Sequence, residues 1–255
     1  KNARPSGLHY NVNFQLLNAA NYGVPQTRER VFIVGVRSDL NVRWSFPEET
    51  HSKQALMYEQ KENGSYWEKH AVTPDKAHFA QCHGEAQQEQ KSLFSEPLKP
   101  WLTVRDAIAH LPDPLCNHGI DDHVFKGGAK SYPGHTGSYY DLPAKTLKAG
   151  VHGVPGGENM VRYADDSIRY FTVHEAKLLQ TFPADFEITG AWGEAMRQIG
   201  NAVPVSLARI IGTRLRETLE GQNRNERHGF VGKAWAKGQQ LSQPIAPRTP
   251  YAAPL

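Results

Sequence analysis

The sequence predicts an α/β fold, and two observations carry that prediction. The first is a continuous apolar run of strand length, residues 30–36, which is rich in β-branched side chains. The second is a pair of amphipathic segments with helical spacing, one over residues 172–182 and one after Pro204. A chain of 255 residues, of which 39% are apolar, can bury a sizeable core in one large domain or two small ones.

The first part of the chain predicts two strands joined by a turn. Residues 1–13 are polar, and we expect them to be irregular. The segment FQLLN, residues 14–18, predicts a short strand, and residues 22–25 predict a turn because their proline cannot donate to a ladder. Together with the run at residues 30–36, this pattern favours a hairpin or two neighbouring strands.

A polar row precedes the second strand. Residues two apart in an extended segment share a face, so Gln26, Arg28 and Arg30 should point one way. Two guanidinium groups and an amide form a donor-rich surface that suits planar targets. On these residues alone, a solvated strand end is the favoured interpretation, since exposed arginine is common and exposed ion pairs contribute little.

The middle of the chain is less informative. Residues 44–101 are polar and rich in Gln and Glu, which indicates an insertion or surface excursion, partly helical and partly mobile. Thiol and imidazole side chains are usual zinc ligands. They occur here at His78, Cys82, His83, Cys116, His118 and His123. Their spacing is not that of a CxxC pair and they lie in two segments, so we expect ordinary surface histidines and no metal site.

Residues 103–111 predict a short amphipathic helix. Thr103 is its cap, Asp106 holds the capping-box position and Pro112 ends it. The residues that follow are interrupted by Gly, Pro, Asn and Asp, which predicts loops. Residues 145–147 then predict a strand leading into a glycine-rich loop at 150–157. That loop lacks the Gly-Lys-Ser/Thr ending of a phosphate cradle.

The most explicit stretch is residues 169–204. Thr172 caps a helix with Glu175 at the capping-box position, and Pro183 stops that helix. A sharp turn is expected over residues 199–203, where Gly200 has no side chain and another backbone or a ligand can approach. A long helix follows Pro204 and is predicted to end at Gly221, with a disordered tail over residues 222–255.

Three separated motifs resemble the C-terminal portion of DNA cytosine-5 methyltransferases of the bacterial restriction-modification type. They are GVPQTRERVFIVG, HEAKLLQTFP and QIGNAVPV, in the family order and with a long variable region between the first two. The resemblance implies the C-terminal end of a Rossmann-like, S-adenosylmethionine-dependent methyltransferase domain plus a small, loop-rich target-recognition domain. The implied division is 1–43, end of the catalytic domain; 44–101, variable insertion; 102–163, target-recognition domain; 164–221, helices returning to the catalytic domain; and 222–255, tail.

The resemblance also implies roles for individual residues. Arg28 and Arg30 would lie beside a flipped-out cytosine, one of them donating to its ring oxygen, with Gln26 holding the loop. Residues 200–202 would contact S-adenosylmethionine largely through the backbone, at Gly200, Asn201 and Ala202, although many relatives have Gly-Asn-Ser. Six residues would contact DNA, with a flexible surface loop as an equal alternative for each. They are Lys148, His152, Gly156, Gly157, Glu158 and Asn159.

Motifs that the family carries earlier in its sequence are not found. They are the Pro-Cys-Gln loop of the nucleophile, the Glu-Asn-Val segment and the glycine-rich cofactor turn; residues 114–117 match none of them and follow Gln26 in chain order. The chain also begins with Lys1 rather than Met. We therefore expect a piece of a longer protein or one half of a split enzyme, inactive alone, whose partners are double-stranded DNA and an N-terminal catalytic portion.

Two other interpretations are weaker or different in class. A non-catalytic DNA-binding remnant or partner subunit would retain the recognition region without turnover. An unrelated hydrolase has no recognisable nucleophile elbow or carboxylate pair. A net charge of +3 permits an anionic partner without requiring one, and the two cysteines fit a reducing cytoplasm. No apolar run approaches the length of about 20 residues that a membrane span needs.

Overall fold

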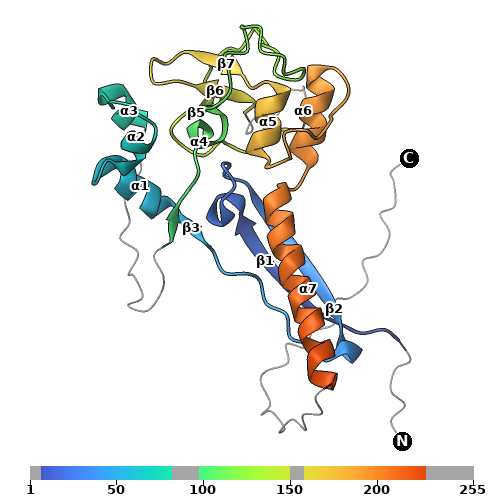
Figure 1. The fold of residues 1–255 in the computed structure, drawn as a ribbon. Helices are drawn as coiled ribbons and strands as arrows, with labels where there is room; N and C mark the ends of the chain where they lie inside the picture. The colour runs from blue at the N-terminus through green and yellow to red at the C-terminus, as the bar shows by residue number, and fades with distance from the viewer. Residues whose placement is uncertain (1–6, 82–97, 150–157, 228–255) are drawn as a thin grey trace, which may run out of the picture.

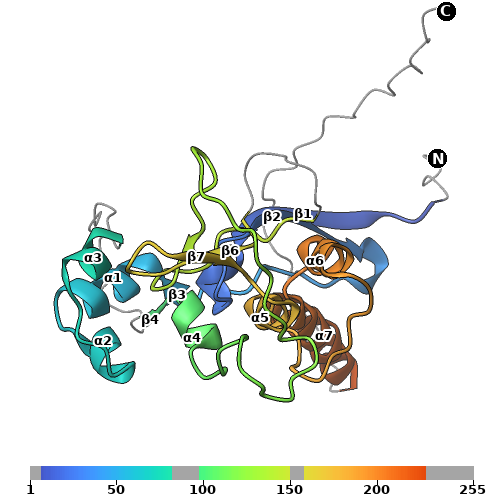
Figure 2. The same ribbon diagram turned by 90° about the horizontal axis from the view of Figure 1, so that it is seen from above.

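The computed structural model describes residues 7–81, 98–149 and 158–227. Its lower part is a long two-stranded sheet with one helix running alongside it (Figure 1). Strands β1 (Tyr10–Asn18) and β2 (Glu29–Arg37) pair antiparallel without a break in register. Helix α7 (Val205–Arg227) lies along one face of this pair (Figures 1 and 2).

A small core joins the sheet to α7. Between the strands the chain makes a 3-10 turn, η1 (Ala19–Tyr22), which Asn18 caps and Gly23 ends at a φ of 79°. A second turn, η2 (Ser38–Leu40), follows β2. The buried members of the core come from opposite ends of the described chain: Leu17, Ala19, Tyr22, Val24 and Leu207. The sheet is therefore covered on the face that α7 occupies.

The insertion forms a separate small unit. It contains β3 (His51–Ser52), α1 (Lys53–Lys61), α2 (Ser65–Lys69), α3 (Lys76–Gln81) and β4 (Lys99–Pro100), with β3 and β4 parallel. Its aromatic residues Tyr66 and Trp67 are buried with Leu56 in one cluster, against which Trp101 and Leu142 pack. The expected helical content is present.

The upper part packs short strands against two helices. It contains α4 (Val104–Ile108), β5 (Ser138–Tyr139), β6 (Met160–Arg162), β7 (Ile168–Tyr170), α5 (Val173–Leu179) and α6 (Trp192–Asn201). The strand order is β5-β6-β7, parallel and then antiparallel. The largest core cluster lies here: Val104, Ile108, Ala144, Leu147, Val161, Phe171, Ala176, Leu179, Met196 and Ile199.

Both predicted capping boxes are confirmed. The Thr103 side chain accepts from Asp106 N and the Asp106 side chain accepts from Thr103 N; Thr172 and Glu175 do the same for α5. The strand pair is confirmed as well. Residues 10–13 were expected to be irregular, and that expectation is wrong, because β1 begins at Tyr10 and pairs with β2 as far as Arg37.

Four boundaries differ from the sequence prediction. Residues 145–147 form no strand, because the chain there makes a single bridge between Gln26 and Ala144. Helix α5 ends at Leu179, before a positive φ of 58° at Thr181. Gly200 lies within α6, so the turn comes later. Helix α7 continues past Gly221 to Arg227, since one exposed glycine costs a helix only about 1 kcal/mol.

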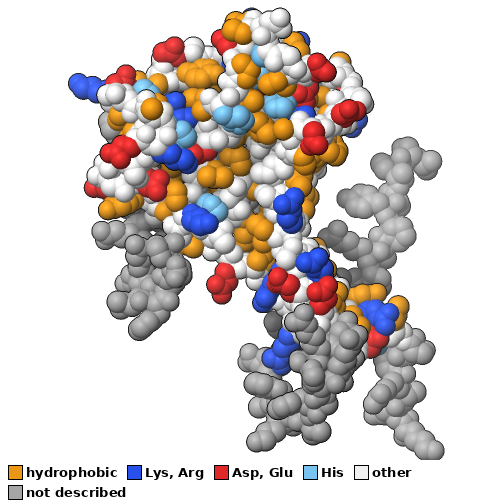
Figure 3. Space-filling view, in the orientation of Figure 1, with side chains coloured by type: hydrophobic (Ala, Val, Ile, Leu, Met, Phe, Trp, Pro, Cys, Tyr) orange, Lys and Arg blue, Asp and Glu red, His pale blue; other side chains and the backbone are white. Residues whose placement is uncertain are grey.

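The last six residues of α7 were expected to begin a disordered tail, and the structure corrects this; residues 228–255 lie outside the described ranges. Charged side chains of both signs lie along the outer face of α7 (Figure 3). One ion pair on α7 joins Arg216 Nε to Glu220 Oε1 at 3.8 Å. Within the described ranges, none of the helices combines the length and the apolar character that crossing a bilayer requires.

Candidate functional site

Four segments that are distant in sequence meet at one point, here called the junction. They are residues 25–28, which lead into β2; residues 144–149; residues 179–180 at the end of α5; and residues 199–202 at the end of α6. Backbone bonds hold the first two together, from Thr27 N to Ala144 O (2.8 Å) and from Ala144 N to Pro25 O (2.9 Å). The three resemblance motifs therefore come together in space.

Gln26 and Arg28 are the polar centre of the junction. The Gln26 side chain is fully buried; it donates to Leu179 O (3.5 Å) and accepts from Leu147 N (3.3 Å). Arg28 is 3% exposed and donates to Leu147 O (3.3 Å) and Gly200 O (2.7 Å). The two side chains share a face, as the alternation predicts, and that face points into the protein.

Gly200 is where two backbones cross. A Cβ placed on Gly200 would lie 2.3 Å from the carbonyl carbon of Lys148 and 2.4 Å from Ala149 N. Real side chains do not approach a backbone so closely, so the position requires glycine. The close approach predicted from the sequence is thus made by another segment of the chain.

The Arg28 guanidinium is a buried cation with carbonyl partners. Among the described residues, its hydrogen bonds go to carbonyl oxygens, and its Nε has no partner. Burial, followed by repulsion from the nearby Arg30, lowers the pKa of Arg28 to about 10. The group remains charged at neutral pH, because that pKa lies well above 7. The junction therefore carries positive charge beside Leu147 and Gly200.

Arg30 is arranged differently from Arg28. It is exposed at the start of β2, and its guanidinium donates only to the neighbouring Glu29 O (2.7 Å) among the contacts of the described residues. The predicted row is thus split: two members hold the protein together, and the third is available to a ligand. The alternating sequence could not show this, because burial depends on the distant segment at Leu147.

The end of α6 offers polar groups for a cofactor. Asn201 is exposed and Ala202 is half-buried at the C-cap, where the helix ends in extended backbone. Gly200 is different, since its α-carbon faces the Lys148–Ala149 backbone and its carbonyl is held by Arg28. An exposed amide with both donor and acceptor suits the amino-acid end of S-adenosylmethionine. Asn201 and Ala202 fit that group better than Gly200 does.

Three of the six predicted DNA contacts lie in the described residues. The backbone of Lys148 exchanges hydrogen bonds with the Asn159 side chain (3.1 and 3.4 Å), and the Lys148 Nζ is enclosed without a partner. Glu158 points inward, with a 2% exposed side chain paired to Lys145 at 2.8 Å. Residues 152, 156 and 157 lie outside the described ranges.

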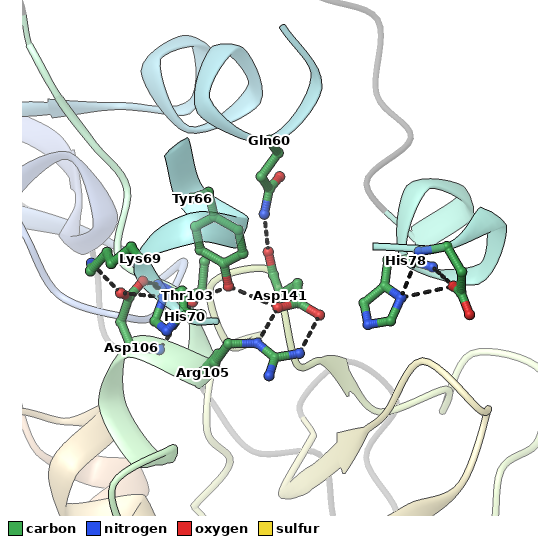
Figure 4. A network of polar contacts seen from close by, with 10 residues as sticks. Gln60, Tyr66, Lys69, His70, His78, Thr103, Arg105, Asp106 and Asp141 are labelled. Carbon is green, nitrogen blue, oxygen red and sulfur yellow. Dashed lines mark hydrogen bonds and ion pairs between the residues drawn. The ribbon is translucent and has the colours of Figure 1, made fainter. Parts of the chain in front are cut away.

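A buried polar network, which sequence analysis does not identify, joins α1 and α2 to α4 and to the loop after β5 (Figure 4). Asp141 is at its centre: it accepts from Arg105 at 2.6 and 3.1 Å and from the Tyr66 hydroxyl at 2.8 Å, and its carbonyl accepts from Gln60 at 2.6 Å. Burial and the Asp141 charge raise the pKa of Tyr66 well above its usual value. No local signal predicts these pairs, because the partners are 36 to 81 residues apart.

Asp106 forms a second part of the same network. One oxygen accepts from Lys69 (2.5 Å) and His70 (3.0 Å), and the other accepts from Thr103. Burial acts to raise the pKa of Asp106, but the hydrogen bonds from Lys69 and Thr103 outweigh it and hold that pKa below its usual value. Asp106, the capping-box partner of Thr103 in α4, thus also holds the C-terminal end of α2.

The histidines are not all surface residues. His123 is fully buried, with contacts from its ring nitrogens to Thr172 (2.8 Å) and the Pro112 carbonyl (2.9 Å). The expectation that His123 is a surface residue is therefore wrong. The loop sequence around it gives no sign of its burial. In the part of the chain that the structure describes, no three His, Cys, Asp or Glu side chains are placed to hold a metal ion; Cys82 and His83 fall outside it.

The face of the β1–β2 sheet away from α7 is apolar, and no described part of the chain covers it. Side chains two apart on each strand share this face, here called the open face. Its exposed members are Tyr10, Val12, Phe14, Leu16, Val31 and Ile33, with exposures of 52 to 76%. Six large apolar side chains in one patch are unusual for a free surface.

Comparison with known proteins gives a consistent result. Residues 5–217 match the family model described as C-5 cytosine-specific DNA methylase. The chain is 34% identical over 211 residues to the type II methyltransferase M.NgoFVII of Neisseria gonorrhoeae, covering 79% of this chain and 50% of the relative. It is 30% identical over 240 residues to M.SacI of Streptomyces achromogenes, covering 82% and 53%.

Among solved structures, the chain is similar to the crystal structure of the S. pombe Dnmt2 methyltransferase. It is 16% identical to this chain, with a TM-score of 0.43, and the match covers 83% of this chain and 58% of the other. The chain spans about half the length of the curated relatives that it matches.

Proposed function

Because the chain belongs to the C-5 cytosine-specific DNA methylase family, we propose that it supplies DNA recognition and completes the base and cofactor pockets of a restriction-modification methyltransferase. The reaction transfers a methyl group to C5 of a cytosine flipped out of a specific duplex site. The observation that carries this proposal is the junction, which brings the three motifs together from both ends of the chain.

Arg30 is the residue proposed to touch the base. It is the exposed member of the row, and its planar guanidinium can donate to the ring oxygen of cytosine. Arg28 acts indirectly: by holding Leu147 and Gly200 it fixes the strand from which Arg30 projects. Gln26 supports the same strand from within. These assignments separate one base contact from two positioning residues.

S-adenosylmethionine is the proposed methyl donor, and when bound it supplies an electrophilic methyl group. Asn201 and Ala202 are the residues of this chain proposed to hold it, through the exposed amide and the backbone at the end of α6. Gly200 contributes by letting the Lys148–Ala149 backbone pass beside that end. Ala202 offers no hydroxyl, so its contact is limited to backbone groups and van der Waals packing.

The nucleophilic thiol is proposed to come from a catalytic portion that packs on the open face. A sheet with helices on one side only leaves apolar surface in water, and methyltransferase sheets of the α/β class are covered on both faces. The open face is large and continuous enough for such a contact. The catalytic portion joins this chain covalently or as a separate subunit.

Replacing Arg30 by alanine is expected to lower methyl transfer by about 100-fold, the usual effect of removing one donor that stabilises the reacting group. The assay is transfer of radiolabelled methyl groups to duplex DNA by the enzyme assembled from this chain and its catalytic portion. Arg216→Ala is the matched control, since Arg216 is an exposed arginine on α7, away from the open face. Unchanged turnover in Arg30→Ala would exclude the base contact.

Charges placed on the open face should prevent assembly. The double substitution Val31→Lys and Ile33→Lys is expected to abolish binding of the catalytic portion, measured by sedimentation, because two lysines would have to be desolvated in the interface. Leu115→Lys, at an apolar residue that is 70% exposed on a loop, is the control. Equal binding by both variants would show that the catalytic portion docks elsewhere.

A non-catalytic DNA-binding module is the second candidate. One observation favours this second candidate: the side chains of Arg28 and Gln26 face inward and bond to the backbone of this chain. The candidate predicts that the chain alone is a stable monomer that binds DNA and gains no activity with any catalytic portion. The open face argues against this candidate, since a stable monomer rarely leaves such a patch in water.

A further inference from the structure

Two residues directly after helix α5 hold the turn that joins α6 to α7. They are Gln180 and Thr181, here called the clamp. The turn is residues 201–204, since α6 ends at Asn201 and α7 begins at Val205. Helices α5 and α6 pack side by side (Figures 1 and 2). The clamp therefore lies close to both helices that flank the turn.

The clamp binds the end of α6 through one side chain. Gln180 is fully buried, and its Nε2 donates to Ile199 O at 2.9 Å and, at the limit of hydrogen-bonding distance, to Ala202 O at 3.5 Å. Carbonyl groups in the last turn of a helix have no acceptor role within that helix, so a donor from elsewhere satisfies them. Asn201 lies between the two carbonyls, and these bonds limit how far it can move.

The clamp also binds the start of α7. Val205 N donates to Gln180 O (3.1 Å), and Ser206 N donates to Thr181 Oγ1 (2.9 Å). The first amides of a helix have no acceptor within the helix, and Pro204 has no N–H to donate. Two adjacent residues thus cap the end of one helix and the start of the next. The turn between these helices is held from both sides.

Two features of the clamp cost stability. Thr181 has a φ of 58°, in the left-handed region, where a β-branched residue is strained. Gln180 Oε1 is buried and has no hydrogen-bond partner among the described residues. An apolar residue at the first position and a glycine at the second would avoid both costs. Strained residues cluster at functional sites, so these features indicate a role beyond packing.

We propose that the clamp positions Asn201 and Ala202 for S-adenosylmethionine, which makes Gln180 and Thr181 positioning residues for methyl transfer. The inference rests on the proposed function, in which the end of α6 holds the cofactor. Neither clamp residue contacts the cofactor; each acts through the helix end that it caps. Loss of either cap lets the turn move, and a displacement of about 1 Å in a positioning group is enough to impair a site strongly.

The test is binding of S-adenosylhomocysteine, measured by calorimetry, to the enzyme assembled from this chain and its catalytic portion. Gln180→Met keeps the length of the side chain and removes its donor. Thr181→Val keeps the β-branched shape and the strain and removes only the hydroxyl. Each is expected to raise the dissociation constant about tenfold, which corresponds to the net contribution of one hydrogen bond. Affinity for duplex DNA should stay unchanged, whereas a general loss of structure would lower both.

Gln60→Met is the matched control. Gln60 is a buried glutamine whose amide donates to a carbonyl, Asp141 O at 2.6 Å, and whose Oε1 has no partner among the described residues. Its replacement should lower the free energy of unfolding as Gln180→Met does, yet leave the affinity for S-adenosylhomocysteine unchanged. Hydrogen–deuterium exchange of the full chain without cofactor is the second measurement. The Ser206 amide should exchange faster in Thr181→Val and at the wild-type rate in Gln60→Met.

The possible failures are distinguishable. If the wild-type enzyme binds S-adenosylhomocysteine and both clamp variants bind it equally well, the clamp does not position the turn, and the proposed function stands. The same conclusion follows if Gln60→Met weakens binding as much as they do. If the wild-type enzyme does not bind it, the proposed cofactor role of the turn fails, and this inference fails with it. Thr181 is half-buried, so Thr181→Val keeps the test decisive if Gln180→Met does not fold.

Discussion

Replacing Gly200 by alanine is expected to destabilise the chain by about 3 kcal/mol, the upper end of what overpacking usually costs. The added Cβ would meet the Lys148–Ala149 backbone at 2.3 to 2.5 Å, and a backbone cannot move aside as a flexible side chain can. Moving α6 instead would break the bond from Arg28 to the Gly200 carbonyl. The measurement is the free energy of unfolding in urea, followed on wild type and variant together.

Gly212→Ala is the matched control for that experiment. Gly212 lies in α7, is exposed, and has nothing within 4 Å of an added Cβ. Alanine there should stabilise the chain by about 0.5 to 1 kcal/mol, because it has the higher helix propensity. The two substitutions make the same chemical change with opposite expected signs. Destabilisation of similar size by both would mean that the crossing at Gly200 is not what matters.

Replacing Asp141 by alanine is expected to have a comparable effect, about 3 kcal/mol. The carboxylate is 1% exposed, and its removal leaves the Arg105 guanidinium and the Tyr66 hydroxyl without their main partner in a buried site. The contact of α1 and α2 with α4 should loosen, since the bonds from Tyr66 and Gln60 to this residue are lost while those from Lys69 and His70 to Asp106 remain. Urea unfolding measures the loss of stability, and proteolysis of residues 53–69 measures the loosening.

Asp141→Asn and Asp39→Ala are the controls for this prediction. Asparagine keeps the size of the side chain and one acceptor oxygen, so the loss of unfolding free energy should be smaller than with alanine. Asp39 is an exposed carboxylate that also pairs with an arginine, Arg37, and its replacement should leave stability unchanged. A wild-type unfolding curve for Asp141→Ala would show that the buried network contributes nothing to holding the insertion.

Local signals in the sequence predicted the parts of the structure that depend on neighbouring residues. Both capping boxes, at Thr103 and Thr172, form as expected because cap and partner are three residues apart. The strand at residues 30–36 was identified because its apolar run is continuous. The three motifs, distant in the sequence, meet in space at the junction.

Features that depend on distant contacts could not be predicted. The extended row gave Gln26, Arg28 and Arg30 the same environment, whereas Leu147 and Gly200 bury two of them and leave the third exposed. Residues 145–147 were predicted to form a strand, but their backbone groups bond to the side chains of Ser138 and Gln26 and to Glu158 N instead of to a ladder. The Asp141 network joins helices whose sequences carry no sign of each other.

The core beneath the sheet has a consequence for synthesis. Leu17 and Val24 are buried against Leu207, so two thirds of the chain separates the strands from the helix that covers them. On a ribosome, the face of the β1–β2 ribbon that packs against Leu207 stays uncovered until α7 has been translated. Contacts of such long sequence separation form slowly, and an uncovered ribbon is prone to pair with other chains during that time.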